Sequence, residues 1–237
     1  MDLTSFLIPA IDIRKGGVVR LVRGDFADQR TYNLKPYEVA EVFDSAGFRR
    51  IHVIDLDGAL EGKPVNLKSI SKIRACFRGY IQVGGGLRDL DGVKILFEEG
   101  IDYAIVGTVA FENRSEFEKI VSTYPGRIIL SVDTRGGFVS IRGWRESSPF
   151  TPDEVLEEFE SYPIGGYLCT VIERDGTLEG VDAEFYRRLR KKTGKPLLAS
   201  GGVSSPDDIK GLEEVVDGVV VGRAIYEGRI PIKGLGV

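Results

Sequence analysis

Short apolar runs alternate with longer amphipathic segments along the whole chain of 237 residues. The runs have the length of strands, and their nearly continuous apolar character indicates burial on both faces. The segments between them have helical spacing: Val39, Val42 and Phe43 fall on one face, Pro36 suits the first turn and Gly47 suits the end. The expected strands are residues 6–11, 50–54, 80–83, 103–106, 128–132, 167–171, 196–199 and 218–221.

Eight strand-then-helix units favour a (β/α)8 TIM barrel, formed as a single domain by residues 1–237. An open, doubly wound sheet is the structural alternative. Against it, the turn after the first strand lacks the G-x-G-x-x-G pattern, and the glycines follow strands three, four, seven and eight instead.

Related strings recur about half a chain apart. The string IDIRKGG at 11–17 resembles VDTRGG at 132–137, and DGAL at 57–60 resembles DGTL at 175–178. The glycines after strands three and four likewise match those after strands seven and eight. The barrel is therefore expected to consist of two duplicated (β/α)4 halves, with equivalent residues on opposite sides of one mouth and a substrate that is roughly symmetric at its ends.

Asp12 and Asp133 end the first and fifth strands, at the face where barrel enzymes build their active sites. Two carboxylates at one site suit general acid–base chemistry if burial keeps one protonated while the other is ionised. An aspartate after a strand can also simply cap a turn. Recurrence at equivalent places in the repeat favours the catalytic interpretation.

Two sets of small residues follow neighbouring strands, one in each half. Glycine lets backbone N–H groups approach an anion, so each set can cradle a phosphate. A single glycine pair is more often a tight turn, but two sets in symmetric positions favour binding. The sets are Gly84, Gly85, Gly86, Gly107 and Thr108, and Gly201, Gly202, Gly222 and Arg223.

Further candidates lie on the second and sixth strands and in two long loops. Thr170 is expected at the end of strand six and Asp175 in the loop after it, and His52 is expected at the position on strand two equivalent to Thr170. A lone histidine on a strand is more often a hydrogen-bonded core residue than a catalyst. Trp144 lies in the loop 135–151, which has the length of a lid; it either stacks on a flat heterocycle or packs the loop down. The loop 16–34 is similarly long.

Composition removes several other classes of function. The formal charge of −4 from 32 basic and 36 acidic residues has no basic cluster, so nucleic acid is not an expected partner. Two cysteines and one histidine do not suggest a metal site or a disulfide framework. No lysine ends a strand, which argues against a Schiff base, and no cofactor motif occurs. We expect no membrane span, no cofactor and a cytoplasmic protein.

Several strings together resemble the ProFAR isomerase family of histidine biosynthesis from residue 9 to about 228. They are PAID at 9–12, VVRLVRGDF at 18–26, HVIDLDGA at 52–59, QVGGGLR at 82–88, SVDTRGG at 131–137, GW at 143–144, RDGTL at 174–178 and ASGGV at 199–203.

This resemblance implies an Amadori rearrangement of an aminoaldose, 5'-phosphoribosyl-formimino aminoimidazole carboxamide ribonucleotide (ProFAR), to the aminoketose PRFAR. The substrate is a small ribonucleotide with a phosphate at each end. Asp12 matches the base that removes the C2' proton, and either Asp133 or Asp175 matches the acid that opens the furanose. Thr170 and His52 match positions near the reacting sugar, and Trp144 matches a residue that stacks on the imidazole. The other expected substrate-binding residues are Arg20, Arg88, Arg142, Gly176 and Thr177.

Three alternatives stay open. The related cyclase subunit of imidazole glycerol phosphate synthase has the same duplicated barrel, but its opening motif reads Cys-Leu-Asp where this chain has Ala10-Ile11-Asp12. A dual-substrate isomerase would also rearrange phosphoribosylanthranilate. A phosphosugar-binding barrel without activity would not need both aspartates.

The C-terminal tail departs from the family, which usually has a closing helix there. Pro231, Gly234 and Gly236 make a regular eighth helix improbable. We expect a monomer or a weak homodimer, in which a subunit contact would cover the wall beside strand eight.

Overall fold

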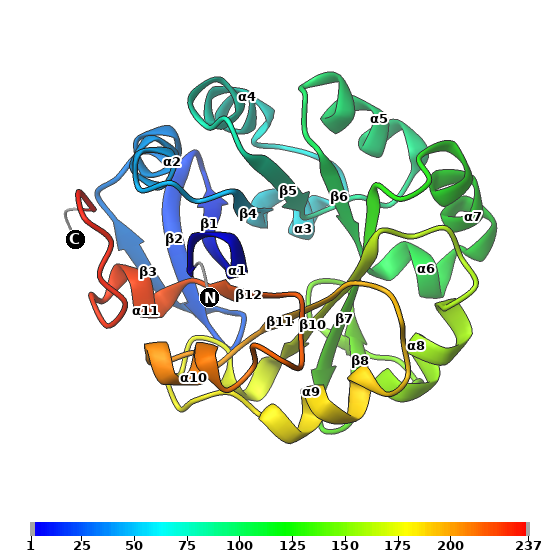
Figure 1. The fold of residues 1–237 in the computed structure, drawn as a ribbon. Helices are drawn as coiled ribbons and strands as arrows, with labels where there is room; N and C mark the ends of the chain where they lie inside the picture. Colours follow the sequence, from blue (N-terminus) through cyan, green and yellow to red (C-terminus); the bar gives the residue numbers. More distant parts are fainter. Residues whose placement is uncertain (1–2, 236–237) are drawn as a thin grey trace.

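The computed structural model describes residues 3–235, and within them eight parallel strands close into a barrel (Figure 1). Closure follows from the pairing of β10 with both β7 and β11, which leaves the parallel sheet without a free edge. The predicted TIM barrel is thereby confirmed. The barrel strands are β1 Leu7–Arg14, β4 Arg50–Asp55, β5 Tyr80–Gly84, β6 Tyr103–Val106, β7 Ile128–Arg135, β10 Gly166–Val171, β11 Leu197–Ser200 and β12 Gly218–Val221.

All eight predicted strands are present, and the boundaries differ mainly at β1 and β7. Phe6 ends the short helix α1 (Leu3–Phe6), so the first strand begins one residue later than expected. Strands β1 and β7 then run on beyond Ile11 and Val132, because each continues into an antiparallel hairpin that extends its hydrogen bonding.

Helices surround the barrel on its outer face (Figure 1). The predicted helix is α2 (Pro36–Ser45), which starts with Pro36 in its first turn and buries Val39 and Phe43. Residue Gly47 follows with a left-handed φ of 84°. The other helices are α3 Leu56–Glu61, α4 Leu67–Cys76, α5 Leu90–Glu98, α6 Thr108–Glu112, α7 Arg114–Thr123, α8 Pro152–Phe159, α9 Ala183–Arg190, α10 Pro206–Lys210 and α11 Arg223–Tyr226, with the 3-10 turn η1 Ile172–Arg174.

The apolar core has two layers, as expected for strands buried on both faces. The larger layer lies between strands and helices. A smaller cluster fills the barrel interior with Ile8, Ala10, Ile105, Ile129, Leu168, Leu198 and Val220. Since these side chains plug the barrel, a substrate can enter only from the mouth above them.

Each of the two predicted long loops contains a β-hairpin that the sequence analysis did not predict. The first contains a hairpin of β2 (Gly17–Val22) and β3 (Asp25–Tyr32), and β2 also pairs with β1. The second contains β8 (Phe138–Ile141) and β9 (Glu146–Ser147), which follow β7. Each half of the barrel thus carries a hairpin after its first strand, and the hairpins hold their polar side chains more rigidly than loops would.

The tail after α11 forms no further helix within the described residues, as Pro231 and Gly234 predict; Gly236 lies outside them. Part of this wall is covered by the tail itself, and the expected subunit contact stays a prediction. Ile230 is buried, and Ile232 and Leu235 pack against the outer core. Figure 1 shows this segment beside α2 and β3.

Candidate active site

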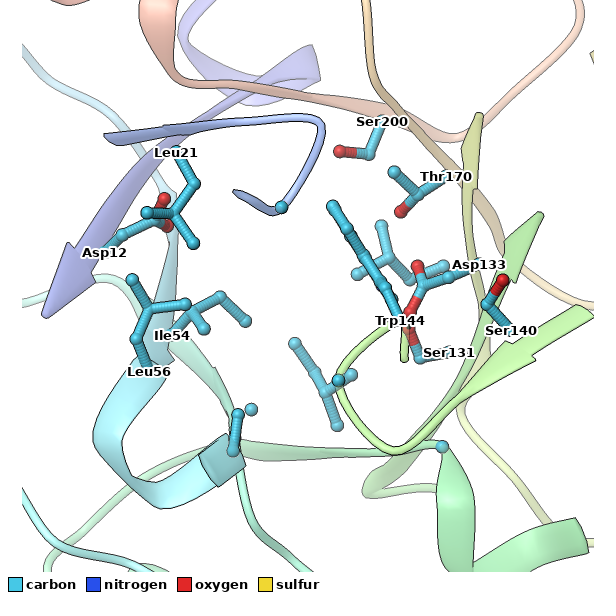
Figure 2. A pocket seen from close by; sticks show the side chains of 18 of the residues that line it. Asp12, Leu21, Ile54, Leu56, Ser131, Asp133, Ser140, Trp144, Thr170 and Ser200 are labelled. Atoms are coloured by element: carbon cyan, nitrogen blue, oxygen red, sulfur yellow. Dashed lines mark hydrogen bonds between the residues drawn. The ribbon is translucent and has the colours of Figure 1, made fainter. Parts of the chain in front are cut away.

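A pocket of about 210 Å³ opens at the carboxyl ends of the barrel strands, and Asp12 and Asp133 line it together. Figure 2 shows them on opposite sides of the cavity, with Trp144 beside Asp133. The predicted residues that also line it are Arg20, His52, Gly84, Gly85, Gly86, Arg88, Gly107, Thr108, Arg142, Trp144, Thr170 and Asp175. A smaller adjoining pocket is lined by Gly176, Gly201, Gly202, Gly222 and Arg223, and shares Arg20 and Asp175 with the first. Thr177 lines neither pocket, and its hydroxyl donates to the carbonyl of Arg174.

Asp12 forms an ion pair with Arg20 of the β2–β3 hairpin. The Arg20 Nη1 to Asp12 Oδ2 distance is 2.7 Å, and the side chains are only 11% and 15% exposed. Burial raises the pKa of Asp12, while the guanidinium pulls the pKa back down. For Arg20, the Asp12 and Asp175 charges outweigh the opposing effect of burial and raise its pKa. Burial is the larger of the two effects, and the permanently charged guanidinium offsets part of it and holds the carboxylate in place.

Asp133 has no such counterion and accepts hydrogen bonds instead. Ser131 Oγ donates to Asp133 Oδ2 at 2.9 Å, and the Thr170 and Trp144 side chains also bond to this carboxylate. Strand pairing explains the contact with Thr170, because Thr170 lies opposite Asp133 in the β7–β10 register. Burial raises the pKa of Asp133, and the three donors partly offset this.

Asp175 lies at the end of η1 and faces both pockets. Burial raises its pKa to about 6, Arg20 opposes this, and the charges of Asp12 and Asp133 raise it further. Three carboxyl groups and one guanidinium thus share a small buried volume. Burial and the two neighbouring carboxylates therefore favour the protonated form of Asp175 more than in an exposed aspartate.

His52 lies deeper in the barrel than expected. The prediction that it is equivalent to Thr170 is wrong, because Asp12 lies opposite Ile54 in the β1–β4 register whereas His52 lies opposite Ala10. Its side chain is buried, and its Nδ1 is 2.8 Å from Gln82 Nε2. Burial, with the charges of Arg20 and Arg50, lowers the pKa of His52 to about 3, so the imidazole is neutral.

The first glycine set forms a turn pressed against neighbouring backbone. Gly85 and Gly86 have φ of 110° and 79°, and a Cβ on either would lie 2.1 or 2.2 Å from a carbonyl oxygen. Only glycine fits this path. The second set repeats it: Gly201 and Gly202 have φ of 96° and 88° and meet carbonyls at 2.7 and 2.3 Å. Both turns expose backbone to their pockets, as the repeat predicts.

Gly222 has a further role that the sequence did not reveal. A Cβ there would lie 1.3 Å from Arg20 Nη2, so the missing side chain makes room for the guanidinium beside Asp12. The neighbouring Arg223 is held at the second pocket by Glu227, with Nε to Oε1 at 2.6 Å, and by the carbonyl of Gly176. Its guanidinium is positioned before any ligand arrives.

Trp144 is held over the pocket by a strained turn. Arg142, Gly143 and Trp144 have consecutive left-handed φ values of 54°, 64° and 67°. Such φ values are costly for residues with side chains, by roughly 1–2 kcal/mol each. The Arg142 guanidinium contacts Glu112 and Glu146, and the backbone N–H of Arg142 donates to Thr108 Oγ1 at 2.9 Å.

A second set of contacts joins this turn to the β2–β3 hairpin. Arg135 Nη1 donates to the carbonyl of Trp144, and its Nη2 donates to the carbonyl of Arg23, both at 3.2 Å. The Trp144 ring lies so close to Gly24 that a Cβ there would be 2.3 Å from it. The two hairpins therefore cover the pocket as connected parts.

Several polar lining residues were missed. Ser131 and Ser200 lie within recognised strings but were not predicted to line the site, and Ser140 lies on the unpredicted strand β8. The inward alternation from Asp133 back to Ser131 was a usable signal. Among the described residues, no three His, Cys, Asp or Glu side chains form a potential metal site, and no helix is long and apolar enough to span a membrane.

Comparison with known proteins now identifies the family. The family model described as histidine biosynthesis protein matches residues 6–231. A protein of Aquifex aeolicus is 52% identical over 235 residues, covering 99% of each chain. Relatives from a Sulfurihydrogenibium species and Persephonella marina are 42% and 41% identical, covering 98% and 99% of this chain and 99% of their own. All three are named 1-(5-phosphoribosyl)-5-((5-phosphoribosylamino)methylideneamino)imidazole-4-carboxamide isomerase. The chain therefore belongs to the histidine biosynthesis protein family.

Proposed function

We propose that this chain is the isomerase that converts ProFAR into PRFAR. The observation that carries the proposal is the placement of Asp12 and Asp133 across one pocket, with a glycine turn of each half opening onto the same cavity system. A substrate with a phosphate at each end matches this symmetry. The relatives carry the name of the same isomerase.

The reaction needs one proton donor and one proton acceptor. The acid protonates the ring oxygen of the ribose as the C1'–O4' bond breaks, which leaves a C1'=N iminium. The base then removes the C2' proton, and the electron pair forms a C1'=C2' enaminol. Loss of the enol proton and protonation of C1' give the aminoketose. Every proton removed is returned, so no external oxidant or reductant is required.

Asp12 suits the role of base. Its carboxylate is held ionised by Arg20 at 2.7 Å, and it lies at the barrel mouth facing the cavity. The ion pair also fixes the carboxylate in position, which matters because a misplaced base loses much of its effect. We propose that Asp12 removes the C2' proton.

The acid is one of two further carboxyls that line the pocket, Asp133 or Asp175. Asp133 accepts three hydrogen bonds, and each of these favours its ionised form. Asp175 has a pKa raised to about 6 and is therefore the more readily protonated in the free protein. We propose that Asp175 is protonated first, and that Asp133 takes up a proton more readily when the substrate draws the Trp144 indole away onto the imidazole, because a donor that favours the carboxylate is then lost.

The two glycine turns are proposed as the phosphate sites. Arg223 reinforces the second, where its guanidinium lies among Gly201, Gly202 and Gly222. Arg88 lines the first and rests against Gly62. Arg142 is proposed to exchange its contacts with Glu112 and Glu146 for the substrate, which competes for the same positive charge.

The remaining partner expectations follow from this function. We propose a monomer or weak homodimer that acts in the cytoplasm without a cofactor and without nucleic acid. Supporting this, Cys76 and Cys169 are both free thiols, which is usual in a reducing compartment.

A spectroscopic assay of the purified protein tests the proposal. We expect turnover of ProFAR and none of phosphoribosylanthranilate. Turnover of both would indicate a dual-substrate isomerase, and turnover only after addition of an ammonia-supplying partner would indicate the cyclase. Binding of ProFAR without any conversion would refute the proposal and leave a phosphosugar-binding barrel.

A further inference from the structure

A buried pair below the aspartates is not explained by the acid–base mechanism. His52, the one histidine of the sequence, lines the floor of the central pocket from β4. The side chain of Gln82 on β5 lies beside it, since the two residues are opposite each other in the β4–β5 register. Gln82 is fully buried and His52 is 6% exposed, so neither side chain can exchange its partner freely for water.

The contact between them defines where the imidazole proton lies. Gln82 Nε2 is 2.8 Å from His52 Nδ1. An amide nitrogen is only a donor, so Nδ1 must be the acceptor and the proton must be on Nε2. The imidazole is therefore neutral, because a ring protonated on both nitrogens would have no acceptor for the Gln82 N–H.

The opposite amide orientation is less favourable. Gln82 Oε1 is buried without a hydrogen-bond partner among the described residues. Turning the amide would place the NH2 group at that position, so both of its N–H groups would lack a partner, whereas in the present orientation one of them bonds to His52 and the carbonyl is unpaired. Unsatisfied buried N–H groups are rarer than unsatisfied carbonyls.

We propose that Gln82 is a positioning residue that fixes His52 in its Nε2–H tautomer, so that the imidazole offers a neutral hydrogen-bond donor to an oxygen of the substrate sugar. This role for His52 rests on the proposed isomerase function, whereas the tautomer itself does not. Neutrality suits the position, because Arg20 and Arg50 both disfavour a second positive charge there. A neutral donor stabilises an oxygen atom without giving up its proton to the nearby carboxylates.

The tautomer can be measured directly in the free protein. Because the sequence contains one histidine, a long-range 1H–15N NMR spectrum of the 15N-labelled full chain shows a single imidazole. We expect the wild-type pattern of a protonated Nε2 and a bare Nδ1. In Gln82→Met, which keeps the length of the side chain but has no donor, we expect a shifted Nδ1 signal and a mixture of tautomers. A protonated Nδ1 in the wild type, or an unchanged pattern in Gln82→Met, would overturn the proposal.

Kinetics then test whether Gln82 acts through His52. We expect Gln82→Met to lower kcat about tenfold with little change in KM, the effect of one misplaced hydrogen bond. In a His52→Ala background the same change should cost less than about twofold, since coupled residues are not additive. Equal losses in both backgrounds would indicate a merely structural role and contradict the proposal.

A matched control is Gln29→Met on β3, where Gln29 bonds to Arg14 and Thr31 outside both pockets. It should leave the histidine spectrum unchanged. If the wild-type protein fails to isomerise ProFAR, the proposed function fails, but the NMR result on the tautomer stands or falls separately.

Discussion

The two halves of the barrel share a backbone plan but differ in what surrounds each aspartate. Both halves carry an aspartate near the end of the first strand, follow this strand with a hairpin and build a glycine turn against neighbouring carbonyls. The hairpin of the first half supplies Arg20 to Asp12, whereas that of the second leads to Trp144 beside Asp133. The two halves therefore carry carboxylates in equivalent places, one paired with a guanidinium and the other bound by hydrogen-bond donors.

The halves differ again one strand later. Asp57 and Asp175 are equivalent in the repeat, yet Asp57 does not line either pocket. It accepts from the Lys15 N–H at 2.6 Å and from Asn66 Nδ2 at 2.8 Å. The reason is the segment after the strand: β4 continues directly into α3, whereas β10 leads into the 3-10 turn that delivers Asp175 to the mouth.

Replacing Asp175 and Asp57 by asparagine, one at a time, should give the largest difference in activity between the two halves. We expect Asp175→Asn to lower kcat about a hundredfold, within the range for loss of a general acid. Asp57→Asn should change kcat less than about threefold, and should instead lower the unfolding midpoint by weakening the Lys15 and Asn66 contacts. Steady-state kinetics with ProFAR and thermal unfolding of both variants make the comparison. Equal losses of kcat would remove the distinction between the halves.

Removing the guanidinium tests what holds Asp12 ionised. In Arg20→Gln, burial of Asp12 is no longer opposed, so its pKa should rise. Because the base works when ionised, the acid limb of kcat/KM should move to higher pH, and activity at neutral pH should fall about tenfold or more. The matched control is Arg78→Gln, whose exposed pair with Asp44 lies on the outer surface. A pH profile that does not move would contradict the assignment.

Asp175 should also make stability depend on pH. Its folded pKa of about 6 lies above the ordinary 3.8, so the folded state favours the proton. The contribution of protonated Asp175 to the free energy of unfolding is fully present below a pH of 3.8 and is lost as the pH rises through about 6. Asp175→Asn should therefore unfold with a free energy on the order of 1–3 kcal/mol higher than wild type at neutral pH, with little difference in mild acid. Urea titrations at both pH values measure this, and a variant less stable than wild type at neutral pH would contradict it.

The smallest expected effect concerns the contact between the hairpins. In Gly24→Ala the new Cβ would meet the Trp144 ring, so the indole should shift, change its fluorescence and raise the KM for ProFAR a few-fold. Gly47→Ala is the control, because it has a similar left-handed φ of 84° but nothing within 4 Å. Both variants should lose about 1 kcal/mol of stability from backbone strain. Identical tryptophan spectra in the two variants would indicate that the hairpins are not coupled.

Much of this arrangement was predictable because its signals are local. Strands buried on both faces are visible as apolar runs, and glycines such as Gly85 and Gly201 recur at a fixed place in the repeat. The hairpins were missed since β3 is largely exposed and has few apolar residues. The depth of His52 in the barrel was not predictable because it depends on strand register. The position of Asp57 outside both pockets was not predictable because it depends on how the chain turns after β4. A comparison of sequence strings contains neither.

The most direct test of the account is the conversion of ProFAR by Asp12→Asn, measured beside the binding of ProFAR to the same variant. We predict that binding is nearly unchanged while kcat falls about a hundredfold to ten-thousandfold, because the amide keeps the shape of the side chain but cannot accept the C2' proton. A variant that binds ProFAR and still converts it at close to the wild-type rate would contradict the assignment of Asp12 as the base.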